Sequence, residues 1–231
     1  MIFTSLASSS KANAYILDDG YTKILIECGL PFKELQARLD FKLNDIAACL
    51  VTHEHKDHSR SALDVIKSGI PVLASHGTAL ALNVNDITTV SPKECICIGS
   101  FKILPFSTFH DAAEPLGYII YSIITKEKLL FATDTVNINT LTSSLSYIAV
   151  ECNFIYDILL KSEHLPEKVK TRIINSHFEV GKLCEYLKKL DLTSCKQIYL
   201  LHMSDSYSNE FLMINMIKSC IGAVSVTACK K

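Results

Sequence analysis

The residues best suited to chemistry form one short stretch of the chain, His53-Glu54-His55-Lys56-Asp57-His58. It directly follows the apolar run at 46–51, which is typical of a buried strand. Residues two apart at a strand end project to the same side, so His53 and His55 can converge on one metal ion, while Asp57 and His58 can face a second ion. The alternative is a charged loop, but the chain has only eight histidines in 231 residues, which favours a metal site.

The types of side chain in this stretch indicate an open, catalytic kind of metal site. Imidazole suits zinc, iron and similar metals, and a carboxylate helps to hold two cations together. A structural zinc finger would usually contribute thiolates, and this stretch has no cysteine. The H-E-x-x-H pattern of metalloproteases also fails, because the residue four positions after His53 is Asp57.

Composition limits the classes of protein that fit. The 231 residues allow one large domain or two small ones, and 48% hydrophobic content permits a sizeable core. The 23 basic and 24 acidic residues nearly cancel, so binding of nucleic acid by bulk charge is not supported. Residues 161–196, which include Lys168, Lys170 and Arg172, carry a local basic excess. A patch for an anionic substrate and a solvated helix face both explain that excess.

Cysteine use and hydropathy indicate a cytoplasmic protein. The nine cysteines include no C-x-x-C pair, and no signal-peptide pattern precedes residue 6. Free thiols in a reducing compartment are therefore expected, with Cys95 and Cys97 as core thiols on one face of a strand. No apolar segment approaches the roughly 20 residues that span a bilayer, so no membrane association is expected. The sequence does not indicate an oligomeric state.

The elements before the histidine stretch should form a small sheet under a helix. Short β-prone runs at 1–6, 13–18 and 22–27 are separated by polar turns, which predicts an antiparallel meander. Pro31 then opens a helix whose apolar face, centred on Leu35, should cover the meander.

A second helix should follow the histidine stretch. Ser59 is a candidate N-cap, and the helix should run to Lys67 before Gly69 ends it. Three apolar side chains are expected to face inward, namely Ala62, Leu63 and Ile66. A strand at 70–74 completes a strand, loop, helix and strand unit, which favours parallel pairing with a right-handed crossover.

The rest of the chain repeats strands and then helices. Further strands are predicted at 87–90, 95–98, 101–107, 116–124, 128–132, 147–150, 197–201 and 223–227. Helices are predicted at 154–161, 166–173, 179–190 and 207–218. Three polar side chains stand directly after strands: His110, Asp134 and His202. One domain over residues 1–231, made of two similar halves that each carry helices outside a sheet, is the expected organisation, and active sites commonly form at such strand ends.

These motifs together resemble the metallo-β-lactamase fold superfamily over essentially the whole chain. His53, His55, Asp57 and His58 match its signature, and the later His110, Asp134 and His202 follow in the expected order. Within the superfamily, three further segments are similar to the YycJ/WalJ-type exonuclease branch: Ser5 to Asn13, His110 to Tyr118, and Glu151-Cys152-Asn153. The residues after Asn153, Phe154 and Ile155, depart from the Asn-His-Asp pattern common in that branch.

The resemblance implies an α/β (α+β) fold, a four-layer αββα sandwich that binds two divalent metals. It assigns His53, His55 and His110 to one ion, Asp57, His58 and His202 to the other, and Asp134 to a bridging position. Zinc is the preferred metal, with manganese or iron as alternatives. His177 competes with His202 for the last ligand position, and the clear strand before His202 favours His202.

The expected reaction is hydrolysis by a hydroxide that bridges the two metals. Asp57 and His177 are the expected catalytic residues. His177 is chosen because an extra histidine in related phosphodiesterases positions phosphate or protonates the leaving group. The two other histidines outside the ligand set, His76 and His164, are expected at the surface near helix starts.

Three functions compete at this point. The first is a phosphodiesterase or DNA exonuclease, with DNA as substrate, in which hydroxide attacks phosphorus. The second is a hydrolase of small esters, lactones or thioesters that uses the same ions to polarise a carbonyl. The third is a non-catalytic, metal-bound regulator, which is disfavoured because none of the seven ligand candidates is missing.

Overall fold

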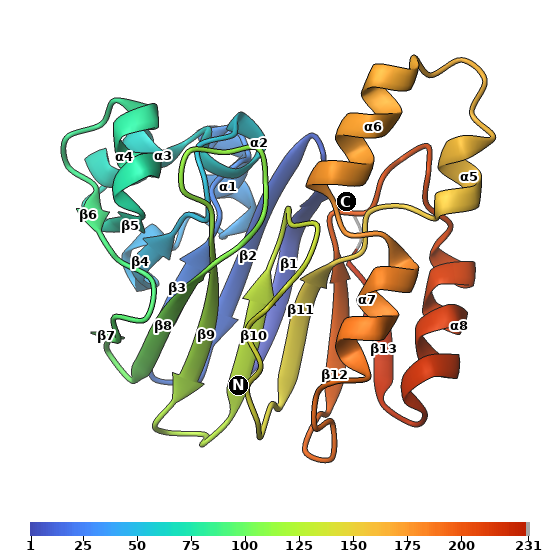
Figure 1. Ribbon diagram of the computed structural model, residues 1–231. Coiled ribbons are helices and arrows are strands. Elements are labelled where there is room, and N and C mark those ends of the chain that lie inside the picture. Colours follow the sequence, from blue (N-terminus) through green and yellow to red (C-terminus); the bar gives the residue numbers. More distant parts are fainter. Residues whose placement is uncertain (230–231) are drawn as a thin grey trace. The chain divides into compact units, whose positions relative to one another are not determined.

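The computed structural model describes residues 1–229, which divide into two compact units. The first unit comprises residues 1–107 and 112–127, and the second comprises residues 108–111 and 128–229. Both units combine strands with helices, which confirms the predicted α/β class (Figure 1). That residues 1–231 form one domain stays a prediction.

The first unit contains a six-stranded sheet whose strands follow one another in sequence order. Its strands are β1 (Ile2–Ser9), β2 (Ala12–Asp18), β3 (Lys23–Ile26), β4 (Ile46–Leu50), β5 (Val72–Ala74) and β6 (Thr88–Thr89). The pairs β1–β2 and β2–β3 are antiparallel, as expected for a meander, and the later pairs are parallel. The histidine stretch therefore leaves the carboxyl end of β4, inside a parallel crossover to β5.

Helix α1 (Phe32–Arg38) covers the meander as predicted. Its Leu35 is fully buried in a core cluster with Ile16 and Leu25 from the strands, and Phe32 and Leu39 pack against that cluster. A short 3-10 turn, η1 (Leu43–Asp45), then leads into β4. Burial of aliphatic side chains at this sheet supplies the main stabilisation of the unit.

The helix predicted from Ser59 to Lys67 is wrong in its start and in one of its three inward residues, Leu63. The chain forms two short helices, α2 (Lys56–Ser59) and α3 (Ala62–Lys67), and Ser59 ends the first instead of capping the second. The Ser59 hydroxyl donates to the carbonyls of Glu54 and His55, which closes the turn of α2. Ala62 is buried and Ile66 packs against the core cluster, as predicted, whereas Leu63 is 46% exposed and Val65 is buried.

Helix α4 (His76–Leu82) and three antiparallel strands complete the first unit. These strands are β7 (Ile96–Ile98), β8 (Phe101–Ser107) and β9 (Leu116–Ser122). No residue range was predicted for α4, although a helix start was expected near His76; the helix begins at a Ser75 N-cap whose side chain accepts from the Thr78 N–H.

Cys95 and Cys97 are both exposed, so their prediction as core thiols is wrong. The partly buried side chains of β7 are Ile96 and Ile98. Because side chains alternate between the two faces of a strand, the isoleucines take the inner face and leave the cysteines outside. All nine cysteines are nevertheless free thiols, as expected.

The second unit is built on four parallel strands in the order β10-β11-β12-β13. They are β10 (Lys128–Ala132), β11 (Tyr147–Glu151), β12 (Gln197–Leu201) and β13 (Ser225–Ala228), and they match the predicted strands closely. The helices are α5 (Tyr156–Leu160), α6 (Glu167–Ser176), α7 (Val180–Leu187) and α8 (Glu210–Ile221) (Figure 1). Parallel pairing brings the carboxyl ends of β10, β11 and β12 to one edge, where the polar side chains follow.

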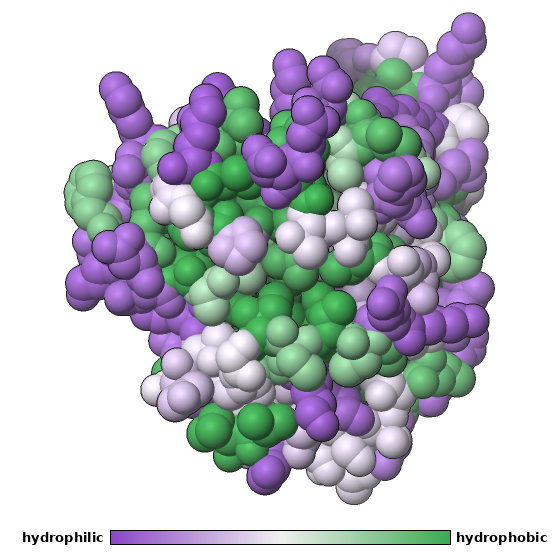
Figure 2. Space-filling model, turned by 90° about the vertical axis from the view of Figure 1, so that its left-hand side faces the viewer, coloured by the Kyte–Doolittle hydropathy of each residue, from purple (hydrophilic) through white to green (hydrophobic). Residues whose placement is uncertain are grey.

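The surface of the described residues mixes polar and apolar side chains. Figure 2, which views the side on which Figure 1 draws α3 and α4, shows hydrophobic residues gathered among hydrophilic ones. Leu80 on α4 is 66% exposed. Within residues 1–229, none of the helices has both the length and the apolar character that crossing a membrane requires.

Candidate metal centre

Four of the seven predicted ligands lie together in the first unit, directly after β4. The ring centroids of His53 and His55 are 4.7 Å apart, and those of His53 and His58 are 4.2 Å apart. The Asp57 Oδ2 lies 3.1 Å from the His58 Nε2. His53 and His58 are buried, while His55 and Asp57 are partly exposed. The segment that ends in α2 therefore gathers imidazole and carboxylate donors.

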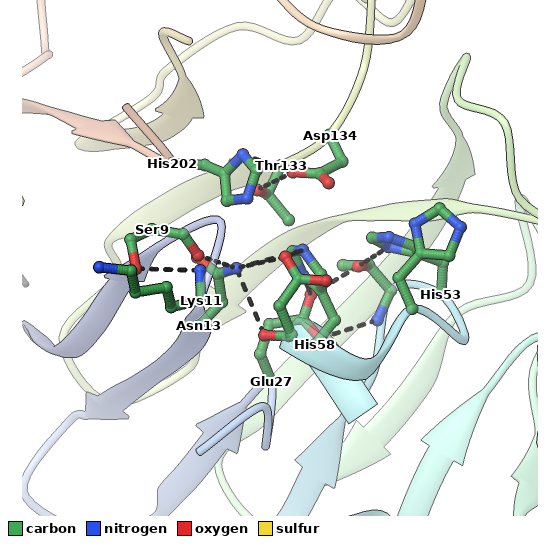
Figure 3. A network of polar contacts seen from close by, with 12 residues as sticks. Ser9, Lys11, Asn13, Glu27, His53, His58, Thr133, Asp134 and His202 are labelled. Atoms are coloured by element: carbon green, nitrogen blue, oxygen red, sulfur yellow. Dashed lines mark hydrogen bonds and ion pairs between the residues drawn. The ribbon is translucent and has the colours of Figure 1, made fainter. Parts of the chain in front are cut away.

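The buried carboxylate of Glu27, which was not predicted from the sequence, contacts this loop. Glu27 directly follows β3, and its Oε1 accepts the Thr52 hydroxyl at 2.5 Å (Figure 3). Since that hydroxyl donates to Glu27, it accepts from the His53 Nδ1–H at 2.9 Å, which leaves Nε2 as the ligand nitrogen. The Glu27 Oε1 also lies 3.4 Å from the His58 Nδ1. Burial raises the pKa of Glu27, against the lowering effect of His58.

Asn13 ties the β1–β2 hairpin to the same loop. Its Nδ2 lies 3.1 Å from the His58 Nε2, and it donates to the Asp57 carbonyl at 3.3 Å (Figure 3). Its Oδ1 accepts from the Tyr15 hydroxyl at 3.0 Å. On the other side of Asp57, a Cβ added to Gly29 would come within 1.7 Å of the Asp57 carbonyl oxygen. The loop is thus clamped between the hairpin and the segment after β3.

The remaining three predicted ligands lie in the second unit. Asp134 follows β10, and its Oδ2 is 3.5 Å from the His110 Nε2. Its Oδ1 is 3.0 Å from the Nδ1 of His202, which follows β12, and it accepts from the Thr133 hydroxyl at 3.0 Å (Figure 3). Asp134 and His202 are 3% and 2% exposed. Asp134 therefore contacts His110 through one carboxylate oxygen and His202, which follows the parallel strand β12, through the other.

His110 is oriented by its backbone surroundings. The Nδ1–H donates to the Ser176 carbonyl at 2.8 Å, which fixes the tautomer and directs Nε2 to the side of Asp134. The segment itself is held by the bond from the Phe109 N–H to the Thr135 hydroxyl at 3.0 Å. Burial lowers the pKa of His110, although Asp134 nearby opposes that shift. A neutral imidazole is the form that binds a metal ion.

Glu151, at the end of β11, joins His177 and His202. Its Oε1 accepts from the His177 Nδ1–H at 2.7 Å and lies 3.2 Å from the His202 Nδ1. Burial lowers the pKa of His177, but the Glu151 carboxylate outweighs this effect and the net shift is upward. For Glu151, burial raises the pKa, yet His177 gives a net lowering. The two groups therefore favour an imidazolium and carboxylate pair.

Asn153 supports His202, although the departure of the following residues from the family pattern had put this segment in doubt. Its Nδ2 donates to the His202 carbonyl at 2.8 Å and lies 3.2 Å from the His202 Nδ1. The strand-end position of Glu151 and Asn153 was the sequence signal that could have identified both.

Three non-glycine residues of these networks adopt left-handed backbone conformations. The φ angles are 64° at Glu27, 46° at Asp134 and 49° at His202. Such conformations are uncommon for residues other than glycine, and they persist where the surrounding contacts enforce them. The turns after β3, β10 and β12 thus direct these side chains at a conformational cost.

The donor set fits divalent metal ions. In the second unit, Asp134, Glu151, His177 and His202 each offer a ligand atom within 4.8 Å of the others. Imidazole and carboxylate are the ligands that zinc, iron and manganese accept. Glu151 enters this group without having been predicted, and both His177 and His202 belong to it. The complete seven-residue ligand set, with His202 as the last ligand, stays a prediction.

Two of the basic residues at 161–196, Lys170 and Arg172, make polar contacts within the second unit. Lys170 is only 8% exposed, and its Nζ donates to the Leu160 carbonyl at 3.1 Å. The Arg172 Nε donates to the Asp111 carboxylate at 2.8 Å. Two of the three named cations are therefore committed to contacts within the unit. His76 and His164 are exposed near helix starts, as expected.

Two proteins named exodeoxyribonuclease are similar to this chain over most of its length. The chain is 29% identical over 224 residues to the exodeoxyribonuclease YycJ of Bacillus anthracis, covering 87% of this chain and 82% of that protein. It is 28% identical over 221 residues to the exodeoxyribonuclease WalJ of Streptococcus pneumoniae, covering 87% of this chain and 81% of that protein. These relatives confirm the predicted resemblance to the YycJ/WalJ branch.

A solved structure confirms the fold. The metallo-β-lactamase fold protein YhfI of Bacillus subtilis superposes with a TM-score of 0.75 at 12% identity, covering 99% of this chain and 96% of that chain. The predicted metallo-β-lactamase type is therefore correct. Residues 22–203 match the family described as the beta-lactamase superfamily domain, and the chain belongs to that family.

Proposed function

We propose that this metal-dependent hydrolase cleaves phosphodiester bonds of DNA as an exonuclease that uses two divalent cations. The observation that carries the hydrolytic part is the gathering of imidazole and carboxylate donors at strand ends within each unit. The similarity to two proteins named exodeoxyribonuclease, over most of the chain, supports DNA as the substrate.

The proposed ligands are the seven residues of the family pattern. His53, His55 and His110 would hold one ion, Asp57, His58 and His202 would hold the other, and Asp134 would be a ligand of both. Zinc is the proposed metal, with manganese or iron as alternatives. When bound, two such ions supply an activated water and offset the negative charge that develops on a phosphoryl group.

The side chains of the protein supply orientation and a proton. Asp57 contributes a carboxylate that is held in place by Asn13 and by the close approach of Gly29. His177, bound through Nδ1 to Glu151, presents its second ring nitrogen for proton transfer to the leaving oxygen. We assign Asp57 and His177 the catalytic roles on this basis.

The proposed setting is the cytoplasm, because the nine free thiols suit a reducing compartment. The proposed partner is DNA, and no membrane attachment is part of the proposal.

A substrate panel tests the proposed function. Purified protein loaded with zinc or manganese is offered end-labelled duplex DNA, end-labelled single strands and bis(p-nitrophenyl) phosphate. Release of nucleotides from a DNA end is the expected result. Hydrolysis of esters, lactones or thioesters without any phosphodiester turnover would replace the proposal with the small-molecule alternative. Absence of all turnover by metal-loaded protein would refute the hydrolytic role.

A further inference from the structure

A pocket lies beside Asp57. Its lining combines two residues of the histidine stretch with residues of the β1–β2 hairpin and the residue that follows α2. The pocket has a volume of about 530 Å³ and is lined by Ser10, Lys11, Lys56, Asp57 and Arg60, all within the first unit. Sites for small molecules have similar volumes, roughly 300 to 1,000 Å³, but they are mostly apolar. Every residue that lines this pocket is charged or bears a hydroxyl, so it is suited to an anion rather than to an apolar ligand.

The charges of the lining are predominantly positive. Three cations, Lys11, Lys56 and Arg60, face one carboxylate, Asp57. All three cationic residues are exposed, and within residues 1–229 neither Lys56 nor Arg60 forms an ion pair. A metal ion bound by Asp57 would offset the only negative charge in the lining. In contrast, two of the basic side chains at 161–196 have partners within the second unit: Lys170 donates to the Leu160 carbonyl and Arg172 to the Asp111 carboxylate.

The two sides of this pocket, the β1–β2 hairpin and α2, are connected by hydrogen bonds of Asn13. Lys11 lies at the tip of the β1–β2 hairpin, and Lys56 and Arg60 are one helical turn apart at α2. Asn13 connects the hairpin to α2 through the Asp57 carbonyl at 3.3 Å and the His58 Nε2 at 3.1 Å (Figure 3). The Asn13 carbonyl also accepts from the Gly29 N–H at 2.9 Å. The cations are therefore positioned relative to a proposed metal ligand.

We infer that this pocket binds backbone phosphates of the nucleic-acid strand next to the bond that is cleaved. The inference rests on the proposed function, and it adds the residues that hold the strand. Lys11, Lys56 and Arg60 contact phosphate oxygens, and such contacts are independent of base sequence. They give the enzyme a preference for a polynucleotide over a small phosphodiester, although the whole chain has a net charge of −1.

The direct test is the salt dependence of strand binding. A fluorescent single strand with phosphorothioate linkages at both ends is titrated with metal-loaded protein at several salt concentrations. The variant carries Lys11→Gln, Lys56→Gln and Arg60→Gln together. Because each phosphate contact on a single strand contributes about 0.7 to the slope of log K against log salt, the triple variant should lose roughly 2 from that slope.

A matched variant controls for the change in net charge. Lys33→Gln, Lys67→Gln and Lys102→Gln remove the same three charges from exposed positions outside the pocket, and the slope should stay close to that of the wild type. The charge-retaining variant Lys11→Arg with Lys56→Arg should keep most of the strand affinity. Equal slopes for the pocket variant and the matched control would overturn the inference.

A second arm separates a strand site from a free-phosphate site. Calorimetric titration should give similar affinities for inorganic phosphate in the pocket variant and the wild type. Strand binding, in contrast, should be much weaker in the pocket variant. A loss of phosphate binding with unchanged strand binding would refute the nucleic-acid assignment. The binding measurement needs no turnover, so a protein that binds DNA through this pocket without cleaving it would contradict the proposed function alone.

Discussion

His177 and Glu151 form the pair most suited to proton transfer among the described residues. The Nδ1–H of the imidazole donates to the carboxylate at 2.7 Å, and the side chain of Glu151 is fully buried. A carboxylate in this position fixes the tautomer of a histidine and stabilises its protonated form. The chemistry of the pair therefore predicts a general acid that acts on the leaving oxygen.

The variant His177→Gln tests that role. Loss of a general acid typically costs 10²- to 10⁴-fold in rate, so kcat on DNA should fall by at least about 10²-fold. The loss on bis(p-nitrophenyl) phosphate should be much smaller, because p-nitrophenolate leaves without a proton. Metal content measured by elemental analysis should not change. An equal loss on both substrates would argue against proton donation.

Glu27 is a positioning residue, since it acts on the metal loop through Thr52 and His58. Replacing it by glutamine keeps the shape of the side chain and removes the charge. Removal of such a partner typically costs 10- to 100-fold in metal affinity. We expect Glu27→Gln to weaken metal binding by about that amount in a chelator competition titration.

An exposed carboxylate provides the control for that experiment. Asp64, on α3, is exposed and lies outside the network around Glu27. Asp64→Asn should leave metal affinity unchanged. Unaltered affinity in Glu27→Gln would show that the buried network does not support the ligands.

At the scale of elements, the loop after β4 depends on the space left by Gly29. A Cβ at that position would meet the Asp57 carbonyl oxygen at 1.7 Å and the His58 nitrogen at 2.9 Å. Because both contacts involve backbone atoms, the loop would have to move. Gly29→Ala should lower stability by about 1–3 kcal/mol and also weaken metal binding.

Gly69→Ala separates the steric effect from the cost of backbone strain. Gly69 has a φ of 86°, and a Cβ there would meet no atom within 4 Å. The substitution should lower stability by about 1 kcal/mol because of the strained conformation, while metal affinity stays the same. Chemical denaturation and metal titration of both variants check the contrast. The explanation fails if Gly29→Ala binds metal as tightly as Gly69→Ala.

The strands and the ligand types were readable from the sequence because both depend on local patterns. Alternating or continuous apolar runs predicted all of β1 to β13 within a few residues. The polar side chains after β4, β10 and β12 stood out against those runs. What failed locally was the orientation of single side chains. At Cys95, one residue of shift along a strand exchanges the buried and the exposed face, and at Leu63 the helix begins later than predicted.

The supporting contacts could not be predicted, because they join residues that are distant in the sequence. Asn13 contacts Asp57 across 44 positions, and Glu27 contacts Thr52 across 25. Nothing in the local pattern around Lys170 or Arg172 shows that their charges meet Leu160 or Asp111.

At the scale of the whole molecule, the buried carboxylate of Asp19 makes the stability of the fold sensitive to acid. Asp19 accepts from the hydroxyls of Ser100 at 2.6 Å and Ser122 at 2.5 Å, and so joins the β2–β3 turn to the segments around β8 and β9. Burial raises its pKa, but these bonds outweigh burial and the net shift is downward. A lowered pKa in the folded state means that the ionised form stabilises the fold.

The sign of the resulting pH dependence follows from that shift. The contribution of Asp19 is present above the ordinary pKa of 3.8 and is lost as the pH falls through the lower pKa of the folded state. Asp19→Asn should reduce the free energy of unfolding at neutral pH by about 1–3 kcal/mol and flatten its decline below pH 4. Urea denaturation across pH measures both effects. An unchanged acid slope in the variant would assign the acid sensitivity to other groups.

The central claim, a metal-dependent phosphodiesterase with two ions, is tested most directly by titrating metal-free protein. Zinc or manganese is added while nucleotide release from end-labelled DNA and metal content are measured on the same samples. We predict that release begins only with metal, saturates at two ions per chain, and is abolished in Asp134→Ala together with tight binding of at least one ion. Equal cleavage by metal-free protein, or by Asp134→Ala, would contradict the claim.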